Sequence, residues 1–230
     1  MQTISFFNLS LTLIPLIFVW YYYKKWTNDS FEIAYSTFRM IIQLISIGYI
    51  LLFIFETKNV FLGLFILIFM MAISTWISLR ITKDKSIKHY KQIFTAIAIS
   101  GTVHLILIIG FVLDLESLYE PRFVIPIAGM IFANTMNALS LAIERFEKEK
   151  TRVSYQKARE IAFKACMIPQ INSLLAVGLV ALPGMMTGQI LSGVDPLIAV
   201  RYQIMIMTMV LSSAGISTIV YFLLKKNENK

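Results

Sequence analysis

Long apolar runs bounded by charged residues constrain this chain more than any other feature of its sequence. A helix needs about 20 apolar residues to cross a hydrocarbon core of about 30 Å. Runs of that length recur through the 230 residues, and they predict seven spans: approximately Phe6–Tyr23, Ile33–Phe55, Val60–Leu79, Ile93–Leu113, Phe123–Ile143, Pro169–Leu191 and Leu197–Leu224. The sequence therefore predicts an all-α, polytopic membrane bundle, formed as one transmembrane domain over residues 1–230.

Composition excludes the main soluble classes. The chain is 57% hydrophobic and only 15% charged, whereas soluble domains carry about a quarter charged residues. A disulfide scaffold is excluded because Cys166 is the single cysteine. We interpret the first run as a retained helix, since it lacks a basic segment before it and a small-residue cleavage site after it.

The distribution of Lys and Arg predicts the orientation. Apart from Arg39, Lys58, Arg122 and Arg201, the basic residues fall in four segments between or after the spans: Lys24 and Lys25; Arg80, Lys83, Lys85, Lys88 and Lys91; Arg145, Lys148, Lys150, Arg152, Lys157, Arg159 and Lys164; Lys225, Lys226 and Lys230. Basic flanks are retained in the cytoplasm. Seven spans place all four segments there if the N-terminus lies outside and the C-terminus inside. The net charge of +8 then follows from topology, and no nucleic-acid partner is needed.

Two predicted spans carry polar residues on one helical face. The second carries a stripe at three- and four-residue steps, comprising Glu32, Ser36, Arg39, Gln43 and Ser46. The fifth carries Asn134 and Asn137, with Glu144 further along that face. Such groups usually face protein or water. Hydrogen bonding between packed helices and contact with a solute are both open for the amides, and Arg39 could instead snorkel to the interface.

The segment from Pro169 to Arg201 is the most informative. Pro183 and Gly184 interrupt an apolar run, which predicts either a proline kink or a broken helix of the kind that forms transporter sites. Further polar or soft side chains occur at several depths: Asn172, Ser173, Met185, Met186 and Gln189, with Asp195 and Arg201 at the outer end. Methionines are potential soft metal ligands, but here we interpret them as apolar packing. His104 is alone in its span and we place His89 in a loop, so no histidine cluster supports a metal site.

Catalytic and nucleotide-binding motifs are absent. The sequence contains no GxxxxGK[ST], HExxH, GxSxG or CxxC. We therefore expect a chain that is not an enzyme and binds no cofactor itself, so any use of ATP must come through a partner subunit. The cytoplasmic loop 144–168 is predicted to become helical from Ser154 onward. It is a candidate docking segment or a solvated connector.

Three stretches resemble the bacterial iron-export ABC transporter permeases of the FetB type, whose plant relatives are linked to aluminium tolerance. They are RMIIQLISIGYIL at 39–51, IPIAGMIFANTMNALSLAIERF at 125–146 and IPQINSLLAVGLVALPGMMTGQILSGVDPLIAVRYQIMIM at 168–207. With the matching order of spans, the resemblance covers nearly the whole chain. It implies the membrane half of a transporter that pairs with a cytosolic ABC ATPase, as two permeases with two ATPases.

The chain departs from that family pattern after Phe146. Family members carry a longer cytoplasmic segment there, with an ALGAT-like coupling helix, whereas this chain continues with EKEKTRVSYQKAREIAFKACMIPQIN. Either the segment from Thr151 to Lys164 docks the ATPase by itself, or the chain is a divergent or impaired member of the family.

We therefore expect a multi-pass permease subunit in the bacterial inner membrane. It would form a homodimer and export a metal ion such as iron, or a small metal complex. The residues expected along the solute path are Arg39, Gln43, Asn134, Asn137, Asn172, Ser173, Pro183, Gly184, Met185, Met186 and Gln189, and those expected to dock the ATPase are Glu144, Arg145, Arg152, Lys157 and Arg159. Two alternatives stay open: an ion-coupled secondary carrier that uses Asp195, Glu32 or Arg39, and a membrane receptor or scaffold that moves no solute.

Overall fold

The computed structural model describes residues 4–57, 59–115, 117 and 119–226. Lys58 and Lys230, which belong to the charge pattern, lie outside these residues. The chain divides into two compact units, Met1–Thr57 and Lys58–Lys230, and each is described by itself. Within the described residues the regular elements are helices, and β pairing is confined to one isolated bridge between Val177 and Ala181.

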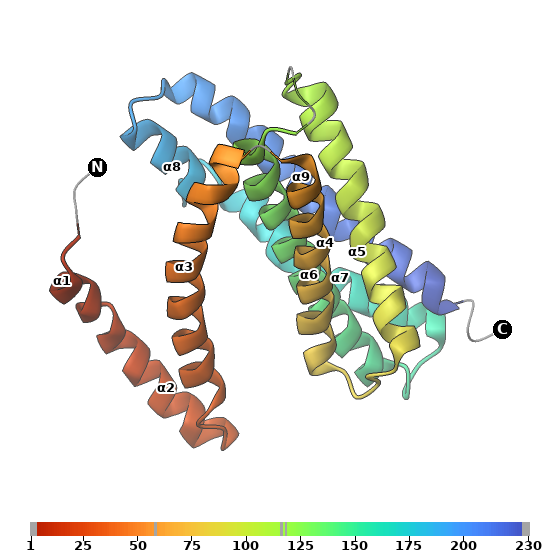
Figure 1. The fold of residues 1–230 in the computed structure, drawn as a ribbon. Coiled ribbons are helices and arrows are strands. Elements are labelled where there is room, and N and C mark those ends of the chain that lie inside the picture. The colour runs from red at the N-terminus through yellow and green to blue at the C-terminus, as the bar shows by residue number, and fades with distance from the viewer. Residues whose placement is uncertain (1–3, 58, 116, 118, 227–230) are drawn as a thin grey trace. The chain divides into compact units, whose positions relative to one another are not determined.

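The first unit consists of α1 (Phe6–Leu11), α2 (Leu13–Thr27) and α3 (Glu32–Thr57) (Figure 1). The first two elements form one apolar stretch that is interrupted at Thr12. Pro15 explains the interruption, because a proline has no N–H to donate to the carbonyl of Leu11. Both predicted spans in this unit are therefore present, one of them with a local break.

The turn between α2 and α3 is built from local hydrogen bonds. Asn28 ends α2 in a left-handed conformation with φ of 59°, which asparagine tolerates better than most residues. The carboxylate of Asp29 then accepts the backbone N–H groups of Phe31 and Glu32 at 2.9 and 3.1 Å. These bonds satisfy amides that the start of a helix leaves without partners.

The second unit contains the remaining helices. They are α4 (Val60–Ser78), the 3₁₀ turn η1 (Leu79–Ile81), α5 (Ile87–Leu107), the π-helical turn η2 (Ile108–Val112), α6 (Pro121–Glu149), α7 (Tyr155–Ala176), α8 (Gly184–Leu191) and α9 (Pro196–Lys226). Polar residues cap several of them: Asn59 accepts amides at the start of α4, Ser86 at the start of α5 and Ser154 at the start of α7. The cap at Ser154 confirms the predicted start of that helix.

Helix α6 is the centre of the second unit, with α4, α5, α7 and α9 packed against it (Figure 1). Its buried positions recur at helical spacing and include Ile131, Phe132, Leu139 and Ile143, all 2% exposed or less. Side chains also bond across helices, because Ser100 in α5 donates to the carbonyl of Ser213 in α9 at 2.9 Å.

A close approach between α5 and α6 depends on Gly101. A Cβ atom at this position would lie 2.5 Å from Cε1 of Phe132, closer than carbon atoms can approach. The ring of Phe132 is itself 2% exposed and has little space to move. Gly101 thus allows α6 to place an aromatic ring directly against the backbone of α5.

Six helical stretches in the described residues are long and apolar enough to cross a membrane: Phe6–Thr27, Glu32–Thr57, Val60–Ile81, Ile87–Val112, Pro121–Glu149 and Pro196–Lys226. They confirm the polytopic helical fold. The remaining predicted span, Pro169–Leu191, is wrong as a single helix, because α7 ends at Ala176 and α8 begins at Gly184.

The break between α7 and α8 begins earlier than the sequence suggested. Gly178 has a left-handed φ of +81°, and the chain turns back so that the Gly178 N–H donates to the Ala181 carbonyl at 3.0 Å. Pro183 then precedes α8 and has no amide hydrogen to lose, so it starts a helix rather than kinking one. Of the two predicted alternatives, the structure shows a broken helix and not a proline kink, and glycine and turn geometry produce the break rather than the Pro183–Gly184 pair.

The start of α5 also differs from the prediction. This helix begins at Ile87, six residues before the predicted span, because Ser86 caps it. The assignment of His89 to a loop is therefore wrong, since His89 lies in the first turn of α5 and is 1% exposed. Its polar neighbours Lys88 and Lys91 lower the hydropathy of this helical turn, which is why the apolar pattern did not include it.

Replacing Gly101 with alanine tests the contact between α5 and α6. We expect Gly101→Ala to lower the free energy of unfolding by about 1–3 kcal/mol, the usual cost of overpacking a filled core. Titration with SDS in mixed micelles would measure this change. Gly48→Ala is the matched control, because no atom lies within 4 Å of a Cβ there. An equal loss in both variants would contradict the proposed contact.

A second prediction concerns the turn after α7. Gly178→Ala should destabilise the protein by about 1–2 kcal/mol, because a left-handed backbone conformation brings Cβ too close to the following carbonyl oxygen. Gly178→Asn should cost less, since asparagine tolerates this conformation. The same titration would compare these variants with Gly184→Ala, a glycine with no neighbour within 4 Å of a Cβ and no left-handed φ. Equal stability of all three variants would argue against the observed turn.

Candidate functional site

The predicted path residues of α6 and α7 are exposed or half-buried on these two packed helices. Asn134 is half-buried and its amide donates to the Met130 carbonyl at 2.8 Å. Asn137 is exposed, and its side chain has no hydrogen-bond partner in the part of the chain that the structure describes. On α7, Asn172 and Ser173 are also exposed, and Ser173 donates to the Pro169 carbonyl at 2.9 Å.

The amides lie at different levels rather than in one cluster. The rings of Phe146 and Tyr155 are 5.3 Å apart and fix where the antiparallel helices α6 and α7 meet. Asn137 is nine residues from that point and Asn172 is seventeen. At about 1.5 Å per residue, the two amides are therefore roughly 12 Å apart along the helices. They can line a path but cannot hold one small ion together.

The segment between α7 and α8 exposes backbone acceptors. The Ala176 carbonyl accepts the N–H groups of Leu179, Val180 and Ala181. Within the described residues, no backbone N–H donates to the carbonyl oxygens of residues 177–180. Leu179 and Val180 are 90% and 84% exposed. This turn therefore offers carbonyl oxygens that no described backbone N–H engages, beside exposed side chains.

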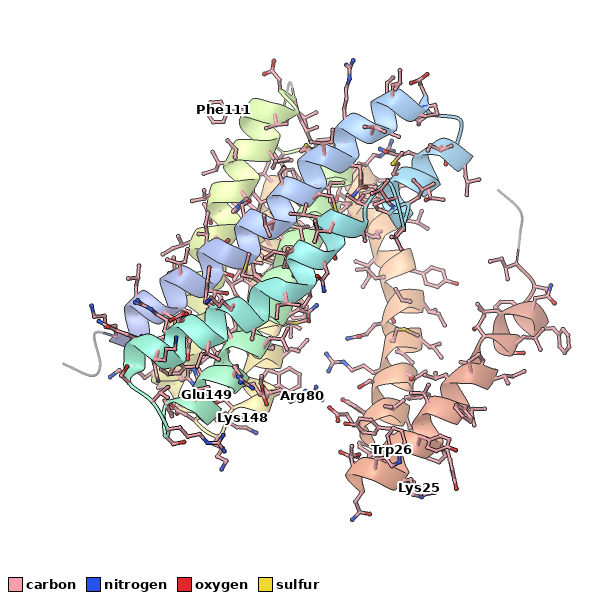
Figure 2. The ribbon with its side chains drawn as sticks, turned by 180° about the vertical axis from the view of Figure 1, so that it is seen from behind. Lys25, Trp26, Arg80, Phe111, Lys148 and Glu149 are labelled. Atoms are coloured by element: carbon pink, nitrogen blue, oxygen red, sulfur yellow. The ribbon has the colours of Figure 1, made fainter. Side chains whose placement is uncertain are left out.

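The break between α7 and α8 occurs before the chain reaches the end of the helix bundle. Tyr155 in α7 donates to the carbonyl of Phe222 in α9 at 2.7 Å, which aligns the two helices at one end. From that bond α9 runs back to Pro196, about 8 Å further than α7 runs to Ala176, at about 1.5 Å per residue. In Figures 1 and 2 the α7 ribbon accordingly stops short of the level that α5 and α9 reach.

The predicted path residues in and around α8 have different roles. Pro183 and Gly184 form the start of α8, Met185 is exposed and Met186 is half-buried. The side-chain oxygen of Gln189 is buried and has no hydrogen-bond partner within the described residues. Asp195 accepts the amides of Leu197 and Ile198 at 2.8 and 3.4 Å, so its role here is to begin α9.

Two predicted path residues lie in the first unit. Arg39 is half-buried and Gln43 is exposed on α3. The structure does not determine where this unit lies relative to the second, so the joint contribution of these residues and the α6 amides to one path stays a prediction.

Sequence reasoning missed a groove between α5, η2 and α9. Its volume is about 410 Å³, and it is lined by His104, Leu107, Ile108, Val112, Arg201, Ile204, Met205, Thr208, Met209 and Ser212. The adjoining π-helical turn widens the helix immediately after the last turn of α5, and such turns are frequent at functional sites. Of the predicted residues, only Arg201 contributes to this groove.

His104 is the polar centre of the groove. It is 3% exposed, with Nδ1 2.7 Å from the Ser100 carbonyl and Nε2 2.7 Å from the hydroxyl of Ser212 in α9. The sequence did contain a signal for the α9 side of this groove. Met205, Met209 and Ser212 are spaced four and three residues apart, which places them on one face of a helix. Pairing that stripe with His104, however, required knowing that α5 packs against α9.

The basic segments of the second unit gather at one end. Figure 2 shows Arg80, Lys148 and Glu149 at this end and Phe111 at the other. Thr82 donates to Glu147 at 2.7 Å, and His89 Nε2 is 3.0 Å from the Tyr221 hydroxyl. These bonds, with the one between Tyr155 and Phe222, connect the ends of η1, α5, α6, α7 and α9. This gathering agrees with the predicted placement of three basic segments on one face.

Two carboxylates at this end, those of Asp84 and Glu160, have nearby lysines and hydrogen-bond donors. Hydrogen bonds from Ser86 lower the pKa of Asp84, which also lies 3.8 Å from the Lys225 ammonium. Hydrogen bonds from Lys164 and then Lys157 lower the pKa of Glu160 to about 2. Both carboxylates are therefore ionised at neutral pH.

The predicted docking residues surround the connector from Lys150 to Ser154. Three of them are already engaged within their own helices: Glu144 pairs with Lys148, Arg145 with Glu149 at 2.9 Å, and Lys157 with Glu160 at 3.0 Å. Exposed pairs of this kind contribute about 0–1 kcal/mol and can exchange partners readily. Arg159 is half-buried, whereas Arg152 is exposed and has no ion-pair partner among the residues that are described.

The chain is similar to several known membrane proteins. It is 35% identical over 205 residues to the probable iron export permease protein FetB of Escherichia coli K12, covering 82% of this chain and 78% of that protein. It is 31% identical over 234 residues to the UPF0014 membrane protein YjkA of Bacillus subtilis, covering 94% and 92%. The protein ALUMINUM SENSITIVE 3 of Arabidopsis thaliana is 28% identical over 207 residues, covering 82% and 73%. No solved structure matches the chain.

The family comparison agrees with these relatives. The model of the uncharacterised protein family UPF0014 matches residues 6–228. This chain therefore belongs to the UPF0014 family of membrane proteins.

Proposed function

We propose that this chain is the membrane subunit of an ABC-type exporter in the bacterial inner membrane, and that it moves a metal ion such as iron, or a small metal complex, out of the cell. The observation that carries this proposal is its 35% identity to a protein named a probable iron export permease, over 82% of this chain. The active assembly would contain two copies of this chain and two copies of a separate ATPase.

The break between α7 and α8 supports a solute path. Lipid cannot hydrogen-bond backbone carbonyl groups, so non-helical backbone at membrane depth must be enclosed by protein or face water. Transporters use such interrupted helices to present carbonyls to their solutes. The oxygens of residues 177–180, with Asn172 and Ser173 on the preceding helix, would form the part of the path nearest the break.

The bonded end of the second unit supports coupling to a partner. A push on the connector between α6 and α7 would reach α9 through Tyr155 and the backbone of Phe222, and would reach η1 through Glu147 and Thr82. ATP-driven closure of the partner subunits would thereby move several helix ends together. The path would then alternate between inward and outward openings, with ATP supplying the bias between the two states.

The carrier alternative receives less support from the structure. It needs a carboxylate that can bind and release a coupling ion at membrane depth. Asp195 is already used to cap α9, and the carboxylate of Glu32 accepts a hydrogen bond from Tyr23. We therefore place the ABC exporter ahead of the carrier.

Purification from the native membrane with mild cross-linking tests this proposal. We expect an ATPase to co-purify in stoichiometric amount, and its ATP hydrolysis to depend on this chain. Transport into inverted vesicles should stop when ATP is depleted. Transport that survives ATP depletion but stops when the proton gradient is collapsed would favour the carrier, and an absence of flux would favour the receptor or scaffold.

Charge reversal tests the docking surface separately. Arg152→Glu combined with Lys157→Glu should weaken binding of the ATPase to this chain roughly tenfold, which corresponds to about 1.4 kcal/mol of binding free energy. The concentration of this chain that half-maximally stimulates ATP hydrolysis should rise by the same factor. The fold should persist, because both side chains are exposed. Arg122→Glu is the matched control, since Arg122 is exposed in the first turn of α6, at the opposite end of that helix. Equal effects of the two changes would contradict docking at the connector.

A further inference from the structure

We propose that the groove between α5 and α9 binds a soft monovalent metal cation of the Cu(I) class, through Nε2 of His104 and the thioethers of Met205 and Met209. All three residues line the groove. This inference goes beyond the proposed function, because it assigns a site and a ligand class that do not depend on coupling to an ATPase.

The hydrogen bonds of His104 leave the correct nitrogen for a metal. A backbone carbonyl can only accept, so the 2.7 Å contact with Ser100 requires Nδ1 to carry the hydrogen. In the neutral ring, Nε2 then presents its lone pair on the side of α9. Histidines that bind metals usually donate their other ring N–H to a carbonyl or carboxylate in this way.

The Ser212 hydroxyl has a second acceptor besides the Nε2 nitrogen of His104. Its hydroxyl oxygen lies 2.7 Å from Nε2 of His104 and also 2.7 Å from the Thr208 carbonyl. The single hydroxyl proton can serve only one of these acceptors at a time. A cation on Nε2 would take the place of the Ser212 hydroxyl in front of that nitrogen, so binding requires the Ser212 side chain to rotate away from the ring.

The remaining donors select a soft cation. Met205 and Met209 are one helical turn apart on the face of α9 that lines the groove. Thioethers favour Cu(I), and imidazole also suits copper, whereas hard cations prefer oxygen ligands. The groove is therefore a poor site for magnesium, calcium or aluminium.

Charge favours a monovalent ion. Among the described residues, those that line the groove include no carboxylate, and they include the positive Arg201. A divalent ion would enter an apolar environment with no negative group to offset its second charge. One positive charge, bound by neutral nitrogen and sulfur ligands, is the class that this arrangement accepts best.

Silver binding to the purified protein tests the site, because Ag(I) has the softness and charge of Cu(I) without its redox chemistry. All variants carry Cys166→Ser, so that the thiol takes no metal. We expect about one tight Ag(I) per chain by calorimetry. Met205→Leu with Met209→Leu conserves side-chain volume and should weaken binding by at least about tenfold, since loss of outer-shell partners alone costs 10–100-fold.

Met207→Leu is the matched control, because Met207 is on the same helix but does not line the groove. It should bind Ag(I) as tightly as the parent. The proposal is overturned if no saturable binding is observed, if Met207→Leu weakens binding as much as the double variant does, or if Fe(II) displaces Ag(I) at equal concentration. These results do not depend on the ATPase experiment, so either proposal can fail while the other stands.

Discussion

Hydrocarbon cannot hydrogen-bond a peptide group, and the rest of this structure depends on that constraint. It explains why the described chain is folded into long helices. It also implies that a helix can end within the membrane only where protein or water surrounds its backbone. Between Ala176 and Gly184 the chain leaves helical geometry before it reaches the end of the bundle, and the carbonyls of residues 177–180 receive no backbone N–H from the described part of the chain. A lipid-facing position would leave these oxygens unsatisfied at a cost of several kcal/mol each. The break therefore requires water or further protein beside it.

The two ends of the second unit differ in how they are held. At the basic end, side-chain bonds join the end of η1 to α6 through Thr82, and join both α5 and α7 to α9 through His89 and Tyr155. At the other end, α7 stops early, α8 is only eight residues long, and the π-helical turn interrupts the regular bonding of α5. Local structure with fewer regular hydrogen bonds opens more easily. A bonded block at one end and interrupted helices at the other suit a permease that receives a push on one side and opens a path on the other.

Sequence periodicity predicted most of the fold but little of the site. Apolar runs set the helices within a few residues, because membrane thickness fixes how long such runs must be. They failed at Pro169–Leu191, where a left-handed glycine ends the helix without lowering hydropathy, and at His89, whose polar helical turn does not look like a span. Asn134 and Asn172 were predicted to line the path because an amide in an apolar run is conspicuous, and that role stays a prediction. The groove at His104 was missed, because His104 and Met205 are more than 100 residues apart in the sequence and only packing brings them together.

Solvent access to the turn after α7 tests the central claim most directly. In a Cys166→Ser background, Leu179→Cys and Val180→Cys would be exposed to a membrane-impermeant maleimide in right-side-out and inverted vesicles. Ile106→Cys, an exposed apolar position in α5, serves as the comparison. If water reaches the break, both cysteines should react much faster than the one at position 106 from at least one face of the membrane. Labelling at the rate of position 106 in both kinds of vesicle would show that water does not reach the turn, and would contradict its role in the path.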